Sequence, residues 1–99
     1  MIRGTTPTVE FTLPFLLSNV DKIWITFSQN NSELFTLEKQ DCELYEYTIQ
    51  ATLTQKQTLK LLSQTMVEIQ VRLLTKTGVA MASNIIKEPV QRILKDGEI

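Results

Sequence analysis

The segment MVEIQVRLLT, Met66–Thr75, decides the fold, because apolar and polar side chains alternate along nearly all of it. Successive side chains of a β-strand point to opposite faces of a sheet, so this alternation predicts a strand with one buried and one solvated face. A strand of this kind is typical of antiparallel sheets. The expected buried face carries Val67, Ile69, Val71 and Leu73.

The residues after this strand predict a hairpin. Lys76–Gly78 is expected to form a three-residue turn whose glycine takes the left-handed conformation, which costs glycine nothing. The return strand is predicted over Val79–Lys87, and Pro89 interrupts it because proline cannot donate to a strand ladder. Val90–Leu94 is expected to be a last strand or edge segment, and Lys95–Ile99 a tail.

The residues before this strand contain four more segments with strand-like side-chain patterns. A short polar stretch, Gln29–Ser32, separates two of them and predicts a tight hairpin. In the last segment the alternation changes phase near Glu46, so that Ile49 and Ala51 belong to its inward set. The predicted strands are Thr8–Leu13, Val20–Ser28, Glu33–Glu38 and Leu44–Leu53.

One short helix is predicted between the two halves of the chain. Thr54 is followed three residues later by Gln57, which is the spacing of a capping box at a helix N-terminus. We expect one or two helical turns within Gln55–Leu61, with Leu59 and Leu62 closing over one end of the sheets.

These elements predict an all-β fold: an immunoglobulin-like antiparallel β-sandwich of about seven strands with one short helical crossover. A small barrel is the alternative architecture. Thr, Val and Ile supply 28 of the 99 residues, and such β-branched side chains favour strands. The length allows one domain, residues 1–99, in which residues 1–7 are expected to form an extended arm.

Composition excludes several kinds of chemistry. The chain has no His and a single Cys, so it cannot form an intramolecular disulfide or the usual zinc finger, and it lacks the commonest general base. The lone Cys42 is expected to be passive and partly buried. With only three Gly, the chain also has no phosphate-binding loop. We therefore expect no enzyme activity, no catalytic residues, no cofactor and no bound metal.

The charge pattern argues against two classes of partner. The net charge is −1, which provides no electrostatic footprint for nucleic acid. No apolar stretch is long enough for a signal peptide or a membrane span, so we expect a protein made in a cytoplasm that does not bind membranes. Residues 1–50 carry −4 and residues 51–99 carry +3, which is compatible with chance or with complementary faces on successive copies of a homo-oligomer.

Aromatic residues provide the candidate contacts with a partner. Trp24 is expected on the polar face of its strand, where it covers the edge of its own sheet, packs under a terminus, or anchors an interface. Tyr45 and Tyr47 are further candidates, and together with Trp24 they suggest an aromatic platform. The arm could add to a neighbouring molecule as a strand. Its candidate contact residues are Arg3, Thr5, Thr6 and Pro7.

Nearly the whole chain resembles small β-sandwich proteins encoded by bacteriophages and prophages of Gram-positive bacteria. The stretches that carry this resemblance are Arg3–Phe15, Ile23–Gln29, Val67–Gly78 and Ala80–Ile86. The architecture is similar to the N-terminal module of phage baseplate and fibre proteins. The resemblance implies a virion structural protein that binds other phage structural proteins, first in the host cytoplasm and then in the virion. It implies no active-site residues.

Two other functions remain open at this point. A binding module for carbohydrate or a host-surface ligand would use Trp24 with Tyr45 or Tyr47 to stack on sugar rings. A small phage protein that inhibits a host factor is the third possibility.

Overall fold

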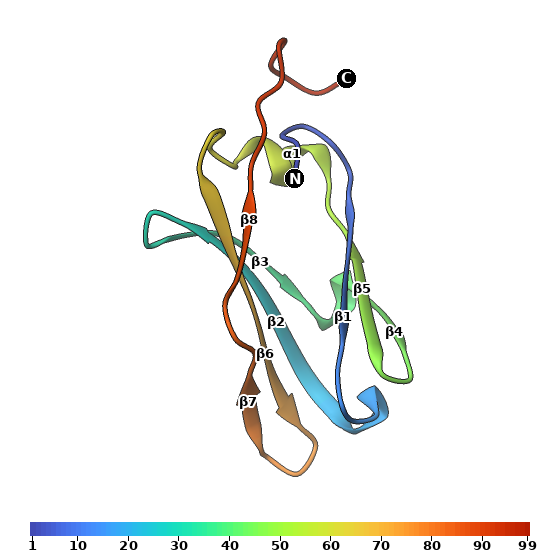
Figure 1. Cartoon of the computed structure of the whole chain (residues 1–99). Helices are drawn as coiled ribbons and strands as arrows, with labels where there is room; N and C mark the ends of the chain where they lie inside the picture. The colour runs from blue at the N-terminus through green and yellow to red at the C-terminus, as the bar shows by residue number, and fades with distance from the viewer.

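The computed structural model describes all residues, Met1–Ile99, and folds them into two antiparallel sheets that pack against each other (Figure 1). The first sheet has the strand order β1-β5-β4, and the second has the order β3-β2-β6 with both β7 and β8 paired to the far edge of β6. The strands are β1 (Thr8–Thr12), β2 (Val20–Gln29), β3 (Ser32–Glu38), β4 (Glu43–Tyr45), β5 (Thr48–Thr52), β6 (Met66–Thr75), β7 (Ala80–Ala82) and β8 (Ile86–Pro89). The helical segments are η1 (Leu17–Asn19), η2 (Lys39–Asp41) and α1 (Gln55–Leu59).

The two antiparallel sheets confirm the all-β sandwich, and their strand order can be compared with that of an immunoglobulin domain. Immunoglobulin domains place strands A, B, E and D in one sheet and strands C, F and G in the other, and variable-type domains add C′ beside C. By position across each sheet, β1, β5 and β4 take the places of B, E and D, while β3, β2 and β6 take those of C′, C and F. Strands β7 and β8 together take the place of G. No strand corresponds to A, so β1 is the edge strand of its sheet.

The core consists of the inward side chains that alternation predicts. Strand β6 buries all four of its expected residues, and β2 buries Ile23, Ile25 and Phe27. The rings of Phe27 and Phe35 stack with their centroids 4.6 Å apart, which ties β2 to its neighbour β3. Burying aliphatic and aromatic side chains of this size contributes roughly 1.5–3 kcal/mol each, so the interior of the sandwich is the main source of stability.

The prediction of one strand over Leu44–Leu53 is wrong, because the chain turns within it. Strands β4 and β5 form a hairpin in which Tyr45 lies opposite Thr48, and Glu46 at the turn has a φ of 43°. The turn is fixed from outside the hairpin, since the Leu17 amide donates to the Glu46 carbonyl at 2.6 Å. The inward set of β5, Ile49 and Ala51, is confirmed.

The return strand after β6 also differs from the prediction. The turn at Lys76–Gly78 is confirmed, with Gly78 at a φ of 89°, but the strand that follows is broken into β7 and β8. Ser83 causes the break, because its hydroxyl accepts from the Val71 amide at 3.0 Å where a backbone carbonyl would continue the ladder. Val90–Leu94 is not a strand, and its only bridge joins Gln91 to Ile2.

The short helix is confirmed with its cap. The Gln57 amide donates to the Thr54 hydroxyl at 3.1 Å, and the Thr54 amide donates to the Gln57 side chain at 2.9 Å. The residue that closes the sandwich below the helix is Leu61, which is buried, and not Leu62, which is exposed.

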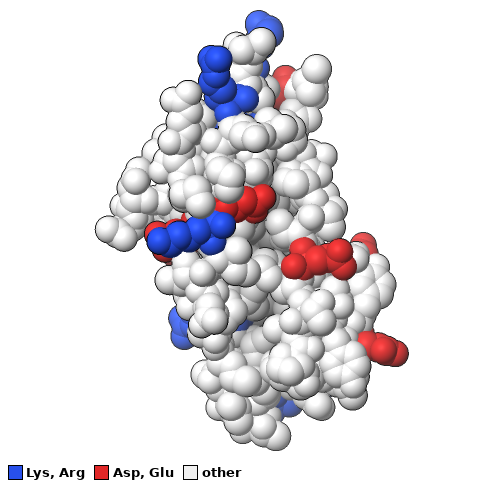
Figure 2. Space-filling model, viewed as in Figure 1, with Lys and Arg blue, Asp and Glu red and all other residues white.

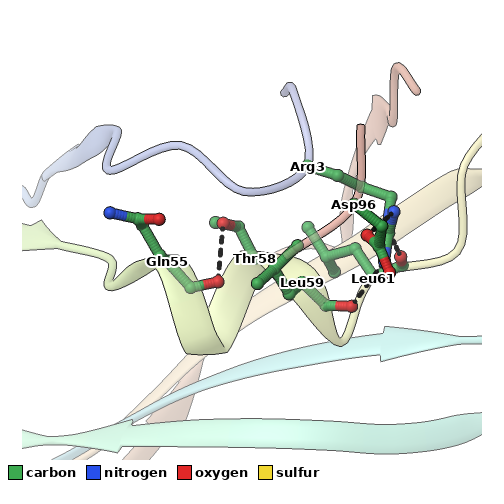
Figure 3. A network of polar contacts seen from close by, with 6 residues as sticks. All are labelled: Arg3, Gln55, Thr58, Leu59, Leu61 and Asp96. Carbon is green, nitrogen blue, oxygen red and sulfur yellow. Dashed lines mark hydrogen bonds and ion pairs between the residues drawn. The ribbon is translucent and has the colours of Figure 1, made fainter. Parts of the chain in front are cut away.

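The N-terminal residues lie against their own chain and do not extend away from it as an arm. The terminal ammonium donates to the Pro89 carbonyl at 2.8 Å, and the Gln91 amide donates to the Met1 carbonyl at 2.8 Å. The Arg3 guanidinium donates to the carbonyls of Leu61 at 2.7 Å and Leu59 at 2.9 Å (Figure 3). Residues 1–3 thus join the end of α1 to the segment that follows β8.

Candidate functional site

The structure brings no catalytic or metal-binding cluster together. No group of three or more Cys, Asp or Glu side chains is placed to hold a metal ion. Partial burial, and to a smaller extent the Asp41 carboxylate, raise the pKa of the Cys42 thiol, which disfavours the reactive thiolate. The longest helix, α1, has five residues, so no helix here is able to cross a membrane.

Trp24 lies at the centre of the outer face of the five-stranded sheet, with 45% of its surface exposed. Strand register places it between Glu38 on β3 and Arg72 on β6. The Arg72 guanidinium carbon lies 5.5 Å from the centroid of the indole ring, within the range of a cation–π contact. An acidic, an aromatic and a basic side chain therefore form one row across three strands, which we call the Trp24 row.

Three hollows surround this tryptophan. The largest, about 640 Å³, extends from Trp24 to η2 and β4, and a second of about 220 Å³ lies between Trp24, Arg72 and the β6–β7 pair. A third, of about 330 Å³, is lined by polar side chains of β3 and η2. Hollows and charges of both signs therefore surround one exposed aromatic ring.

The two tyrosines do not join this surface. Leu44 packs on the core, so its neighbour Tyr45 points outward from the other sheet, and Tyr47 lies in the β4–β5 turn. The Tyr45 hydroxyl donates to the Glu43 carboxylate, and this bond and the charge of Glu43 raise the pKa of Tyr45. The outer faces of a sandwich point away from each other, so the expected platform of Trp24 with Tyr45 or Tyr47 does not form.

The expected arm residues are placed at the α1 end of the sandwich. The Arg3 guanidinium donates to two backbone carbonyls and to the Asp96 carboxylate, the last at 2.9 Å. The Thr5 hydroxyl donates to the Ile2 carbonyl at 2.6 Å. The Pro7 carbonyl accepts from the Leu53 amide, while the Thr6 side chain is exposed. Whether any of them contacts a partner stays a prediction.

Sequence patterns missed an apolar opening between the two sheets. On the edge strands beside it, inward apolar side chains are only partly buried, whereas those of β2, β5 and β6 are almost fully buried. We call this opening the β1 seam; it holds a hollow of about 320 Å³ lined mainly by apolar side chains between the end of β1 and β7. Figure 2 shows that the lower part of this side, over β7, is largely uncharged, whereas a basic and an acidic group lie over β8 and an acidic group lies over β1. The β1 seam is bordered by Val9, Phe11, Leu13, Met81 and Ile86.

Comparisons with protein-family models, with curated proteins and with solved structures gave no match to this chain.

Proposed function

We propose that this chain is a phage virion structural protein that acts through protein–protein contacts, with the Trp24 row as its main contact surface. The observation that carries the interaction role is the half-exposed Trp24 with Arg72 held over its ring. Tryptophan and arginine are among the residue types most enriched where binding energy concentrates in protein interfaces.

The row is held in place before a partner arrives. Trp24 and Arg72 are opposed on hydrogen-bonded strands, so their backbones are fixed, and the cation–π contact orders the two side chains. Side chains ordered in the free protein lose less entropy on binding, which improves affinity. A typical partner interface takes roughly 800 Å² from each side. That is about one-eighth of the 6443 Å² of accessible surface on this chain, so one face of the sheet provides enough area.

The assignment to a phage particle is supported by the sequence resemblance alone. On that basis the protein is made in the host cytoplasm and then joins the head or the tail and baseplate as an accessory component. Its partners are other phage structural proteins, with self-association as a further possibility.

The test is incorporation into particles. Particles induced from a strain that encodes the chain are purified by density gradient, and the chain is quantified by mass spectrometry. We expect a fixed copy number per particle, loss of incorporation for Trp24→Ala, and retention for the control Tyr45→Ala, which removes a slightly more exposed aromatic ring from the other sheet. Absence of the unchanged chain from particles would contradict the virion role, and equal incorporation of both variants would contradict the Trp24 row.

Carbohydrate binding is the alternative function, and it now depends on Trp24 without the tyrosines. A glycan array distinguishes the two functions, because a glycan ligand lost in Trp24→Ala would favour sugar recognition over a protein partner.

A further inference from the structure

The free edge of β1 is an unpaired strand edge beside an apolar opening. On its other side β1 pairs with β5, where the Leu53 amide donates to the Pro7 carbonyl at 2.9 Å and the Leu13 amide to the Tyr47 carbonyl at 2.8 Å. Residues of an antiparallel strand alternate between bonding one neighbour and facing the other side. Three residues between these two bonds therefore direct their amides and carbonyls away from β5. They are Thr8, Glu10 and Thr12.

The apolar opening lies along this edge. Val9 and Phe11 face the interior but remain partly exposed, and Ile86, directly opposite the buried Ile69, is 44% exposed. On the opposite side of the sandwich the edge strand β3 buries Phe35 to 8% and Leu37 to 2% exposure. The core is thus closed along β3 and uncovered along β1, where an immunoglobulin domain places strand A.

The chain itself does not supply this strand. Residues 1–3 close only the end of the β1 seam near α1, where they bond to Pro89 and Gln91, and residues 4–7 then cross to β1. The exposed C-terminal tail is also unsuited, because Ile93 and Leu94 are adjacent and would point to opposite faces of a strand.

A second copy of the chain is disfavoured by charge. Two β1 strands paired antiparallel about their centres would place Glu10 directly opposite Glu10, and like charges in that position destabilise a strand pair. Glu10 is the only charged residue of β1, and its carboxylate is already oriented by the Gln50 side chain, which donates to it at 3.0 Å. A cationic side chain across the edge would instead be attracted.

We propose that β1 accepts an extended segment of a partner protein as an added antiparallel strand. Alternate apolar side chains of the segment fill the β1 seam, a Lys or Arg lies opposite Glu10, and the backbone groups of the three outward-facing residues form up to about six hydrogen bonds with it. Pro14 follows β1 with the same parity as its outward-facing residues and has no amide to donate, so it ends the added strand at that side. This inference concerns a different surface from the Trp24 row and does not depend on the proposed function.

Designed peptides test the proposal. The probe is a labelled peptide about nine residues long that alternates Val with Thr and carries Lys at the central outward position; its matched control carries Glu there. Binding to the full chain is measured by fluorescence anisotropy. We expect the Lys peptide to bind about fivefold or more tightly than the Glu peptide, because the pair across the strands changes from attractive to repulsive.

Two variants locate the binding on β1. Glu10→Lys is expected to invert the preference between the peptides, whereas Glu98→Lys, a matched change in the exposed tail, is expected to leave it unchanged. Thr12→Pro removes an amide that faces away from β5, so it should weaken both peptides while the β1–β5 ladder and the circular dichroism spectrum are kept.

Each contrary outcome would overturn the proposal. No binding of either peptide up to about 1 mM would refute strand addition altogether. Binding without a preference, or a preference unaffected by Glu10→Lys, would place the peptide elsewhere. If light scattering finds a homodimer that Thr12→Pro dissociates, β1 pairs with a second copy of this chain and not with a cationic partner strand.

Discussion

Gln29 holds the segment after α1 to the end of β2, and replacing it provides a quantitative test of the fold. Gln29 is 2% exposed, and its side chain makes two bonds to one residue: the amide nitrogen donates to the Leu62 carbonyl at 2.9 Å, and the amide oxygen accepts from the Leu62 amide at 2.7 Å. Gln29→Leu keeps the volume nearly constant but leaves both backbone groups of Leu62 without their partners.

The expected cost follows from these two bonds. A typical hydrogen bond contributes about 1 kcal/mol net, and an orphaned buried group costs about 1–3 kcal/mol, partly offset here by the apolar surface that Leu buries. We expect the free energy of unfolding to fall by about 2–3 kcal/mol, which lowers the Tm of a domain of this size by roughly 10–20 °C.

Urea denaturation followed by circular dichroism measures this change, with Gln40→Leu as the control. Gln40 is exposed and bonds only the neighbouring Glu38 side chain, so its replacement should cost less than about 0.5 kcal/mol. If Gln29→Leu is as stable as the control, the bonds to Leu62 do not hold this junction.

Three further predictions concern the N-terminus, the helix α1 and the thiol of Cys42. Arg3→Met should lower the free energy of unfolding in urea by about 1–3 kcal/mol, because it removes charge-assisted bonds to two carbonyls. Asp96→Ala, on the exposed side of the same network, should lower it by under about 1 kcal/mol. Equal losses for the two variants would contradict the anchoring role of the carbonyls. In the same urea assay, Thr54→Ala should lower the free energy of unfolding by about 1 kcal/mol and Thr54→Ser by much less, since only Ser keeps the capping oxygen. An equal loss for both variants would rule out the cap. Cys42 should react with iodoacetamide near pH 8 more slowly than a small free thiol, because its raised pKa leaves less thiolate at that pH. Asp41→Asn should increase the rate of this reaction, because it removes the charge that disfavours the thiolate. An unchanged rate would show that Asp41 does not act on the thiol.

The central strands could be predicted because their patterns are local. In β6 the alternation of Val67, Ile69 and Val71 with polar residues fixes both the strand and its buried face, and the structure has the predicted bounds. The β4–β5 turn could not be predicted in the same way. Glu46 is not a typical turn residue, and its conformation depends on a bond from Leu17, far away in the sequence. Similarly, Ser83 ends β7 only because Val71 lies opposite it.

In the candidate site, too, some features follow from a local sequence pattern and others depend on residues far away in the sequence. The exposure of Trp24 follows from its position on the polar face of β2, so the sequence indicates it. The identity of its neighbours, Glu38 and Arg72, depends on strand register across two other strands and is not visible in any local pattern. The β1 seam depends on which strand has no neighbour, so it emerges only from the sheet order.

Amide hydrogen exchange along β1 in the free chain, measured residue by residue by NMR, is the most direct test of the open edge. The structure predicts alternation, with slow exchange at Val9, Phe11 and Leu13, whose amides face β5, and fast exchange at Thr8, Glu10 and Thr12. Uniformly slow exchange at all six amides would mean that another strand already covers β1, and would contradict the open edge on which partner-strand addition depends.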